Sequence, residues 1–218
     1  MLKSLLGIGM TVCNEFVYLE LGAISIKTQV LISQWNFWKC VMELAGGNPL
    51  SYMVDQGRKL KLKEVKHYDD LVRKYSSVDE IVDDFYQKIR SDIHKKAADN
   101  RTKYLTYLKV NPELKTPEIY SNLNSQQQIS MIGKLRTSSH SLHVEMGRRS
   151  GLAREARTCC CTNGIEDEEH FLLQCEMYQD IRQKEKVANT NIRKILEDAK
   201  YTTYITNLYQ RRKLMATS

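Results

Sequence analysis

Apolar residues recur at three- and four-residue steps along much of this chain, and this spacing limits the fold more than any other feature of the sequence. Between Ile24 and Leu44 the repeat consists of Val30, Leu31, Trp35, Trp38, Val41 and Met42, and Ala45 continues it. Side chains at this spacing share one face of an α-helix. We therefore predict a long helix here, which Ser25 begins as the N-cap and Gly46-Gly47 ends.

Start and stop signals divide the rest of the chain into further helices. Asn14 begins an apolar run that Gly22 closes, and Asn48-Pro49 begins another helix. The pairs Ser77 to Glu80 and Ser125 to Gln128 have the spacing of capping boxes. Ten glycines and three prolines among 218 residues are about half of ordinary usage, which disfavours a turn-rich β architecture. The sequence predicts an all-α fold of helical hairpins or a bundle.

A connecting segment is expected near Lys115, where Asn111-Pro112 and Thr116-Pro117 interrupt the helical pattern. We predict a helical region over residues 1–115 and a basic, cysteine-bearing region over residues 116–218. The opening MLKSLLGIGM lacks a small-residue cleavage site, so the front of a helical domain is the better interpretation than a signal peptide. No apolar run approaches the roughly 18 residues of a membrane span, and we expect no membrane partner.

Positive charge is concentrated in one segment. Lys and Arg number 33 and Asp and Glu 26, which gives a net charge of +7. Residues 101–150 hold eight basic and three acidic side chains, so +5 of that total lies there. A local excess of this kind fits an anionic partner, and RNA or DNA is the expected one.

Four of the six cysteines lie within seventeen residues, and the spacing C-x-C-x8-H-x4-C is typical of a metal site. Its members are Cys159, Cys161, His170 and Cys175, and Cys160 is an alternative for either of the first two. Four protein ligands would leave no position for water, so the expected ion is a structural Zn²⁺. The competing interpretation is a set of core cysteines beside a surface histidine. A Cys-His nucleophile is disfavoured because no orienting group or oxyanion donor is evident.

The metal reading favours a reducing compartment, the nucleus or the cytoplasm, over a disulfide framework. Upstream, the run GKLRTSSHSLHVEMGRRSGLAREARTC begins at Gly133 and leads directly into the cysteines. Its basic members are the candidate nucleic-acid-binding residues Lys134, Arg136, Arg148, Arg149, Arg154 and Arg157. The charge excess and the expected metal-fixed turn place them on one anion-binding face.

This run and the segment that follows resemble the carboxy-terminal zinc-knuckle region of the polymerase polyprotein of non-LTR (LINE-type) retrotransposons. The family pattern is LR-x-SSH-x-L-x-x-E-x-GR, then R-x-C, then EDE-x-HFL-x-x-C-x-x-Y, and it matches most specifically from Leu135 to Arg182. The amino-terminal LLGIGMTVCNEFVYLELG resembles the thumb and post-thumb region, and RTKYLTYLK resembles the linking segment. Many relatives space the first two cysteines more widely. The resemblance implies a small zinc-knuckle subdomain with helices after the helical bundle.

The carboxylates of a polymerase are missing from this chain. Asp69-Asp70 in HYDDL follows a lysine-rich segment, and Asp83-Asp84 in VDDFY lies inside an amphipathic pattern, so both pairs are expected on solvated helix faces rather than at a two-metal site. We therefore expect a non-catalytic nucleic-acid-binding module that resembles a detached end of such an element. The alternatives are a scaffold for an acidic protein partner or the polymerase core, and a non-functional truncated remnant.

Two smaller patterns have competing interpretations. Trp35 and Trp38 have the spacing of core residues, although exposed tryptophans could stack on bases. His140 and His143 are expected to pack or to face phosphate, because two imidazoles without further donors make a poor metal site.

Overall fold

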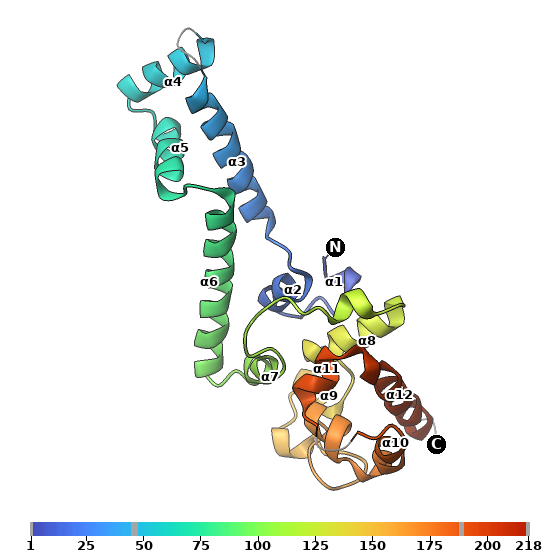
Figure 1. Cartoon of the computed structure of the whole chain (residues 1–218). Helices are drawn as coiled ribbons and strands as arrows, with labels where there is room; N and C mark the ends of the chain where they lie inside the picture. Colours follow the sequence, from blue (N-terminus) through green and yellow to red (C-terminus); the bar gives the residue numbers. More distant parts are fainter. Residues whose placement is uncertain (1, 45–47, 188–189, 217–218) are drawn as a thin grey trace. The chain divides into compact units, whose positions relative to one another are not determined.

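The computed structural model describes residues 2–44, 48–187 and 190–216. Every regular element in these ranges is helical, and a single antiparallel bridge joins Thr158 to Ile165 (Figure 1). The predicted all-α fold is therefore confirmed. The predicted stop at Gly46-Gly47, with Ala45 before it, lies outside the described residues.

The chain divides into two compact units. The smaller unit is Ala23–Asp92, and the larger unit combines Met1–Gly22 with Ile93–Ser218. This division differs from the predicted boundary near Lys115, because Phe16 of helix α2 (Asn14–Leu21) packs on Tyr104 and Tyr107. The sequence could not indicate this, since the two parts of the larger unit are separated by seventy residues.

The smaller unit contains α3 (Ile26–Glu43), α4 (Pro49–Lys59), α5 (Lys63–Lys74) and most of α6 (Val78–Ala98). The α-helices of the larger unit are α1 (Leu2–Leu5), α2 (Asn14–Leu21), α7 (Thr102–Val110), α8 (Gln126–Arg136), α9 (His143–Arg149), α10 (Gln179–Lys184), α11 (Ile192–Glu197) and α12 (Thr202–Ala216). Its short 3-10 turns are η1 (Ile119–Asn122), η2 (Arg154–Ala156), η4 (Glu176–Tyr178) and η5 (Ala199–Tyr201), and η3 (His170–Gln174) is a π-helical turn.

Most predicted helix ends are where the capping rules place them. Ser25 accepts a hydrogen bond from the Thr28 amide at 3.1 Å and begins α3, while Gly22 ends α2 with a φ of 59°. Asn48 caps α4 through the Leu50 amide at 2.9 Å. Asn14 is different: it is the first residue of α2, and the N-cap position belongs to Cys13.

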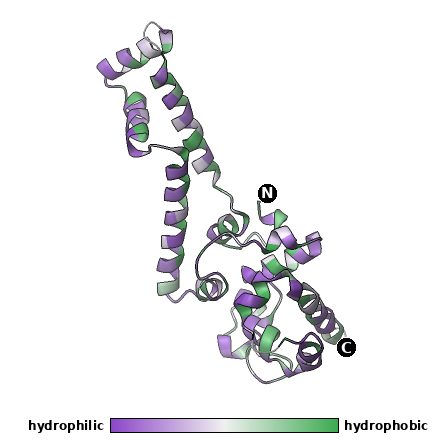
Figure 2. Cartoon of the chain, in the orientation of Figure 1, coloured by the Kyte–Doolittle hydropathy of each residue, from purple (hydrophilic) through white to green (hydrophobic). Residues whose placement is uncertain are grey.

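Both predicted capping boxes form, with one shift. The Glu80 amide donates to Ser77 Oγ at 3.3 Å, and the Gln128 amide donates to Ser125 Oγ at 3.2 Å. The returning side chains reach one residue further back than the motif requires: Glu80 accepts from the Ser76 amide at 2.7 Å. Ser77 and Glu80 stand at the start of α6, and the hydrophobic residues of this helix gather along one side (Figure 2).

The smaller unit is built on its two tryptophans, which are buried as predicted. Helix α3 packs against α5, and Trp35 Nε1 donates to the backbone oxygen of Tyr75 at 3.0 Å. The Trp38 ring stacks on Tyr68 with centroids 5.0 Å apart. Leu71 and Ile81 complete this core. Not all of the predicted face of α3 is buried, since Val30 and Met42 are 49% and 46% exposed.

The larger unit has a continuous core. The cysteine-bearing segment, residues 158–175 (the metal-site segment), contributes side chains to it together with the surrounding helices. Phe171, Leu172 and Cys175 are fully buried in it, together with Leu135 of α8 and Leu208 of α12. Because one core contains both the cysteine segment and the long helices, the segment is part of the fold of the larger unit.

Candidate metal centre and basic pocket

A tight turn presents the first two cysteines of the cluster. The Thr158–Ile165 bridge closes it, the Cys159 amide donates to Gly164 O at 2.8 Å, and the Thr162 amide donates to Cys159 O at 2.9 Å. Gly164 has a φ of 126°, a conformation that a side chain would strain, so glycine is required there. The turn places the sulfur atoms of Cys159 and Cys161 on the side that faces His170.

A short irregular helix presents the other two donors. Asp167 Oδ1 accepts a hydrogen bond from the His170 amide at 2.9 Å and so caps the helix start. The Cys175 amide then donates to His170 O at 2.8 Å, which closes the π-helical turn η3. In this wider turn the residues five apart point the same way, and π-helical turns are frequent at functional sites.

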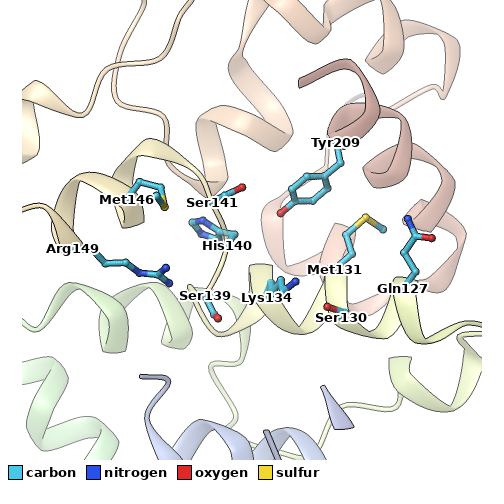
Figure 3. A pocket seen from close by; sticks show the side chains of 10 residues that line it. All are labelled: Gln127, Ser130, Met131, Lys134, Ser139, His140, Ser141, Met146, Arg149 and Tyr209. Carbon is cyan, nitrogen blue, oxygen red and sulfur yellow. The ribbon is translucent and has the colours of Figure 1, made fainter. Parts of the chain in front are cut away.

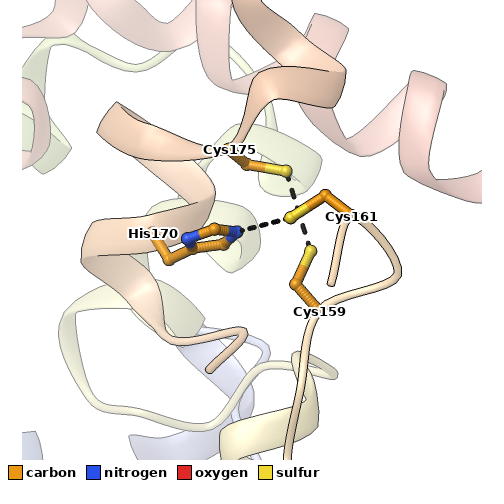
Figure 4. A group of neighbouring side chains, drawn as sticks. All are labelled: Cys159, Cys161, His170 and Cys175. Atoms are coloured by element: carbon orange, nitrogen blue, oxygen red, sulfur yellow. Dashed lines mark hydrogen bonds between the residues drawn. The ribbon is translucent and has the colours of Figure 1, made fainter. Parts of the chain in front are cut away.

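The four predicted donors come together. All the ligand atoms of Cys159, Cys161, His170 and Cys175 lie within 4.8 Å of one another (Figure 4). The Sγ atoms of Cys159 and Cys175 are 3.6 Å apart, and Cys161 Sγ is 3.2 Å from His170 Nε2. Around a tetrahedral zinc ion, two sulfurs are about 3.8 Å apart and a sulfur and an imidazole nitrogen about 3.5 Å. The cluster therefore has a geometry that could hold a metal ion.

Burial separates the cysteines of this segment. Cys160 is exposed and lies outside the cluster, which contains Cys159 and Cys161. Burial raises the pKa of the Cys159 and Cys175 thiols. A bound cation would stabilise the thiolates that burial alone disfavours.

Four acidic residues precede His170, and Glu166, Asp167, Glu168 and Glu169 each have a separate partner. Glu166 is buried and accepts from Arg212 Nε at 2.7 Å and Nη2 at 2.9 Å. Asp167 is the cap, and the exposed Glu169–Lys109 pair spans 3.4 Å. Glu166 therefore anchors Arg212, and Asp167 caps the helix start, in addition to any interaction with the helix dipole.

Glu168 forms the most enclosed contact of that run. Its Oε1 lies 2.8 Å from His140 Nε2 and accepts from Ser138 Oγ at 2.6 Å. Burial opposes ionisation of Glu168, but the interactions with His140 and Ser138 prevail and lower its pKa to about 2. His140 is therefore a packing residue, one of the two roles predicted for it.

His143 has an exposed ring next to the metal-site turn. Its Nδ1 is 2.7 Å from the backbone oxygen of Thr158, and its amide donates to Glu166 Oε2 at 2.7 Å. The ring thus braces the strand-like start of the turn that presents Cys159.

Arg136 must be removed from the predicted anion-binding face. Its guanidinium is 1% exposed, forms a two-point ion pair with Glu20 and donates to Leu196 O at 3.1 Å. A side chain with this many internal partners has no free surface for a phosphate.

Three further candidates have internal partners. Arg157 donates to Leu152 O and to Val144 O at 3.2 Å, so its main role is to hold the loop before the metal-site turn. Arg148 is paired with the buried Glu145. Arg154 lies 3.6 Å from Asp167 and is about half exposed.

Lys134 and Arg149 are the two candidates that keep a free charge. Neither forms an ion pair with any carboxylate in the described ranges, and both line one pocket of about 380 Å³ in the larger unit (Figure 3). The remaining lining is Gln127, Ser130, Met131, Ser139, His140, Ser141, Met146 and Tyr209. Sequence reasoning did not single out Ser139, although it lies in the SSH of the pattern quoted above, and it missed Tyr209, for which no local motif gives a signal.

No protein-family profile, curated protein or solved structure matches this chain. No single helix among the described residues is long and apolar enough to cross a membrane.

Proposed function

We propose that the larger unit is a non-catalytic nucleic-acid-binding module stabilised by a structural Zn²⁺ ion. A donor set of three thiols and one imidazole binds zinc in preference to harder cations such as Mg²⁺ or Ca²⁺. Cys159, Cys161, His170 and Cys175 would fill all four positions of a tetrahedron. Such an ion leaves no site for a reactive water and acts by fixing the fold.

The observation that carries the nucleic-acid proposal is the pairing state of the basic residues. Most of the predicted basic face is committed to internal partners, whereas Lys134 and Arg149 share a pocket without a carboxylate to neutralise them. Two uncompensated cations held close together repel each other, and an anion in the pocket removes that cost. The local excess of +5 over residues 101–150 fits a polyanionic partner.

The resemblance to the carboxy-terminal region of LINE-type polyproteins supports the same reading and implies RNA or target DNA as the ligand. It also implies a nuclear or cytoplasmic setting. We also propose that the chain has no polymerase activity. Asp69 and Asp70 lie on helix α5, whereas a two-metal polymerase site holds its paired carboxylates at a strand turn.

A salt-dependent binding titration on the full chain tests the proposal. Labelled single strands and duplexes are titrated at several KCl concentrations, and the metal content is measured on the same samples. The Lys134→Ala/Arg149→Ala variant should reduce the slope of log K against log salt by about 1.4 for single strands and about 1.8 for duplexes.

The matched control is Lys184→Ala/Lys194→Ala, which removes the same charge from exposed positions of the larger unit that do not line the pocket. It should leave the slope almost unchanged. An equal effect of both variants, or no binding at low salt, contradicts the proposal and favours an acidic protein partner, the polymerase core or a remnant without function.

A further inference from the structure

The basic pocket has two chemically different ends. Lys134 and Arg149 lie on either side of Ser139 in Figure 3, and Tyr209 and Met131 lie beyond them toward α12. Its volume of about 380 Å³ falls within the range of small-molecule sites. The pocket is large enough for one nucleotide and too small for a base pair.

Ser139 adds a directed donor to the cationic end. It is only 8% exposed, and its Oγ accepts a hydrogen bond from the Gly9 amide at 3.1 Å. Because the oxygen is the acceptor in that bond, its hydroxyl proton is available to an oxygen in the pocket. Two cations and a buried hydroxyl are the donors that a phosphate group requires.

The other end of the pocket is apolar. Met131 offers a polarizable thioether and Tyr209 an aromatic ring, whereas Met146 lies beside Arg149 (Figure 3). The Tyr209 hydroxyl is buried and has no hydrogen-bond partner among the described residues. The Tyr209 side chain is the aromatic group of this lining, and an aromatic ring is the kind of surface on which a nucleobase stacks.

The metal-site segment holds the walls of this pocket. Tyr209 packs on Phe171 with ring centroids 5.2 Å apart, directly beside the metal-site residue His170. Glu168 holds the His140 ring, and Glu166 holds Arg212 of α12, one helical turn from Tyr209. The pocket is consequently built on the same ten-residue segment that supplies two of the four metal donors.

We infer that this pocket takes one unpaired nucleotide of a single-stranded nucleic acid. The phosphates on the two sides of this nucleotide lie against Lys134 and Arg149, with Ser139 between them, and the base enters the apolar end beside Tyr209. Bases in a duplex are already stacked and paired, so they cannot enter, and duplexes are left with the phosphate contacts alone. This inference rests on the proposed function and specifies its ligand class.

The test compares a fluorescein-labelled twelve-nucleotide single strand with the duplex of the same sequence, on the full chain with its metal. Tyr209→Leu should weaken single-strand binding at least about fivefold, leave duplex binding unchanged and keep the salt slope. Tyr209→Phe is the matched control and should bind like the parent, because the hydroxyl has no partner to lose.

Two further measurements guard against a loss of fold and identify the ligand group. The far-UV circular dichroism and the metal content of Tyr209→Leu should match those of the parent. Uridine monophosphate should displace the labelled strand at lower concentration than inorganic phosphate at equal ionic strength.

The outcomes separate the inference from the proposed function. Salt-dependent binding that is equal for single strand and duplex, and unaffected by Tyr209→Leu, overturns the inference and leaves the proposed function standing. Equal displacement by phosphate and by the mononucleotide also overturns it, because the base would then add nothing. No binding of either oligonucleotide overturns both.

Discussion

Arg136 donates from Nε and Nη2 to the two carboxylate oxygens of Glu20, at 2.6 and 3.0 Å, across 116 residues of sequence. The hydroxyls of Tyr107 and Tyr120 donate to the same carboxylate at 2.8 and 2.6 Å. Burial and the charge of Glu20 raise the pKa of both tyrosines, so they remain donors. A buried ion pair is tolerable only while each charge keeps its partner.

Removal of one member of that pair should therefore be severe. We expect Glu20→Ala to lower the free energy of unfolding of the larger unit by about 3–5 kcal/mol, since it leaves the Arg136 charge buried and unpaired. Urea unfolding followed by far-UV circular dichroism measures the change. Lys109→Ala, which breaks an exposed pair with Glu169, should cost no more than about 1 kcal/mol. Equal losses of unfolding free energy in the two variants would show that the buried pair contributes no more to stability than the exposed pair.

Loss of the metal should unfold the larger unit. We expect one zinc ion per chain by mass spectrometry under native conditions, and a large fall in Tm after chelation or in the His170→Ala variant, because metal-binding free energy is also folding free energy. Cys160→Ser is the control and should keep both the metal and the Tm, since Cys160 is exposed and outside the cluster. A metal-free protein of unchanged Tm after gentle purification contradicts the zinc site.

The stability of the smaller unit should depend on pH through Asp69. Hydrogen bonds from Arg58 at 2.8 and 2.9 Å, together with one from Trp38, hold the pKa of Asp69 below its usual value. A lowered carboxyl pKa stabilises the fold above the unfolded-state value of about 3.9, and this contribution is lost as pH falls through the lower folded-state pKa. Asp69→Asn should therefore weaken the unit at pH 7, and its difference from the parent should shrink in strong acid.

Tryptophan fluorescence during urea unfolding reads out this effect, because both tryptophans of the chain lie in the smaller unit. Asp70→Asn is the matched control: it disrupts an exposed pair with Arg73 and should change stability little at any pH. A deficit in Asp69→Asn that stayed constant down to strong acid would indicate a packing defect instead of a lost charge.

The Asp69-Asp70 pair should also fail to support polymerisation. Asp69 is committed to Arg58 and Trp38, and Asp70 is an exposed neighbour on the same helix. The two carboxylates therefore do not form the paired metal site that nucleotide transfer needs. We expect no primer extension with Mg²⁺ and all four deoxynucleotides. Incorporation by the parent that Asp69→Asn abolished would contradict the assignment.

Features that depend on neighbouring residues could be predicted from the sequence. The Ser25 and Asn48 caps, the two buried tryptophans and the four metal donors all follow from spacings of at most a few turns, and each lies where the spacing places it. The residue that each reciprocal capping contact reaches and the N-cap of α2 differ from the prediction by one position, and Val30 and Met42 of the predicted α3 face are about half exposed.

Features that depend on distant partners could not be predicted. Arg136 has the sequence context of a basic surface, and only Glu20, far away in the chain, makes it a core residue. The basic pocket likewise combines α8, α9 and α12, so no short motif contains both Lys134 and Tyr209. Charge counting located the segment that contains Lys134 and Arg149 but could not distinguish paired from unpaired cations.

The long separation between Glu20 and Arg136 sets an order of events during synthesis. The smaller unit has its own core of Trp35, Leu71, Tyr75 and Ile81, so it can fold on the ribosome as soon as that stretch emerges. Glu20 emerges earlier still, yet its carboxylate stays in water until Arg136 follows, and the metal donors come later again. A nascent chain halted between these points carries a folded smaller unit and an amino-terminal segment with exposed apolar residues, a state that invites chaperone binding.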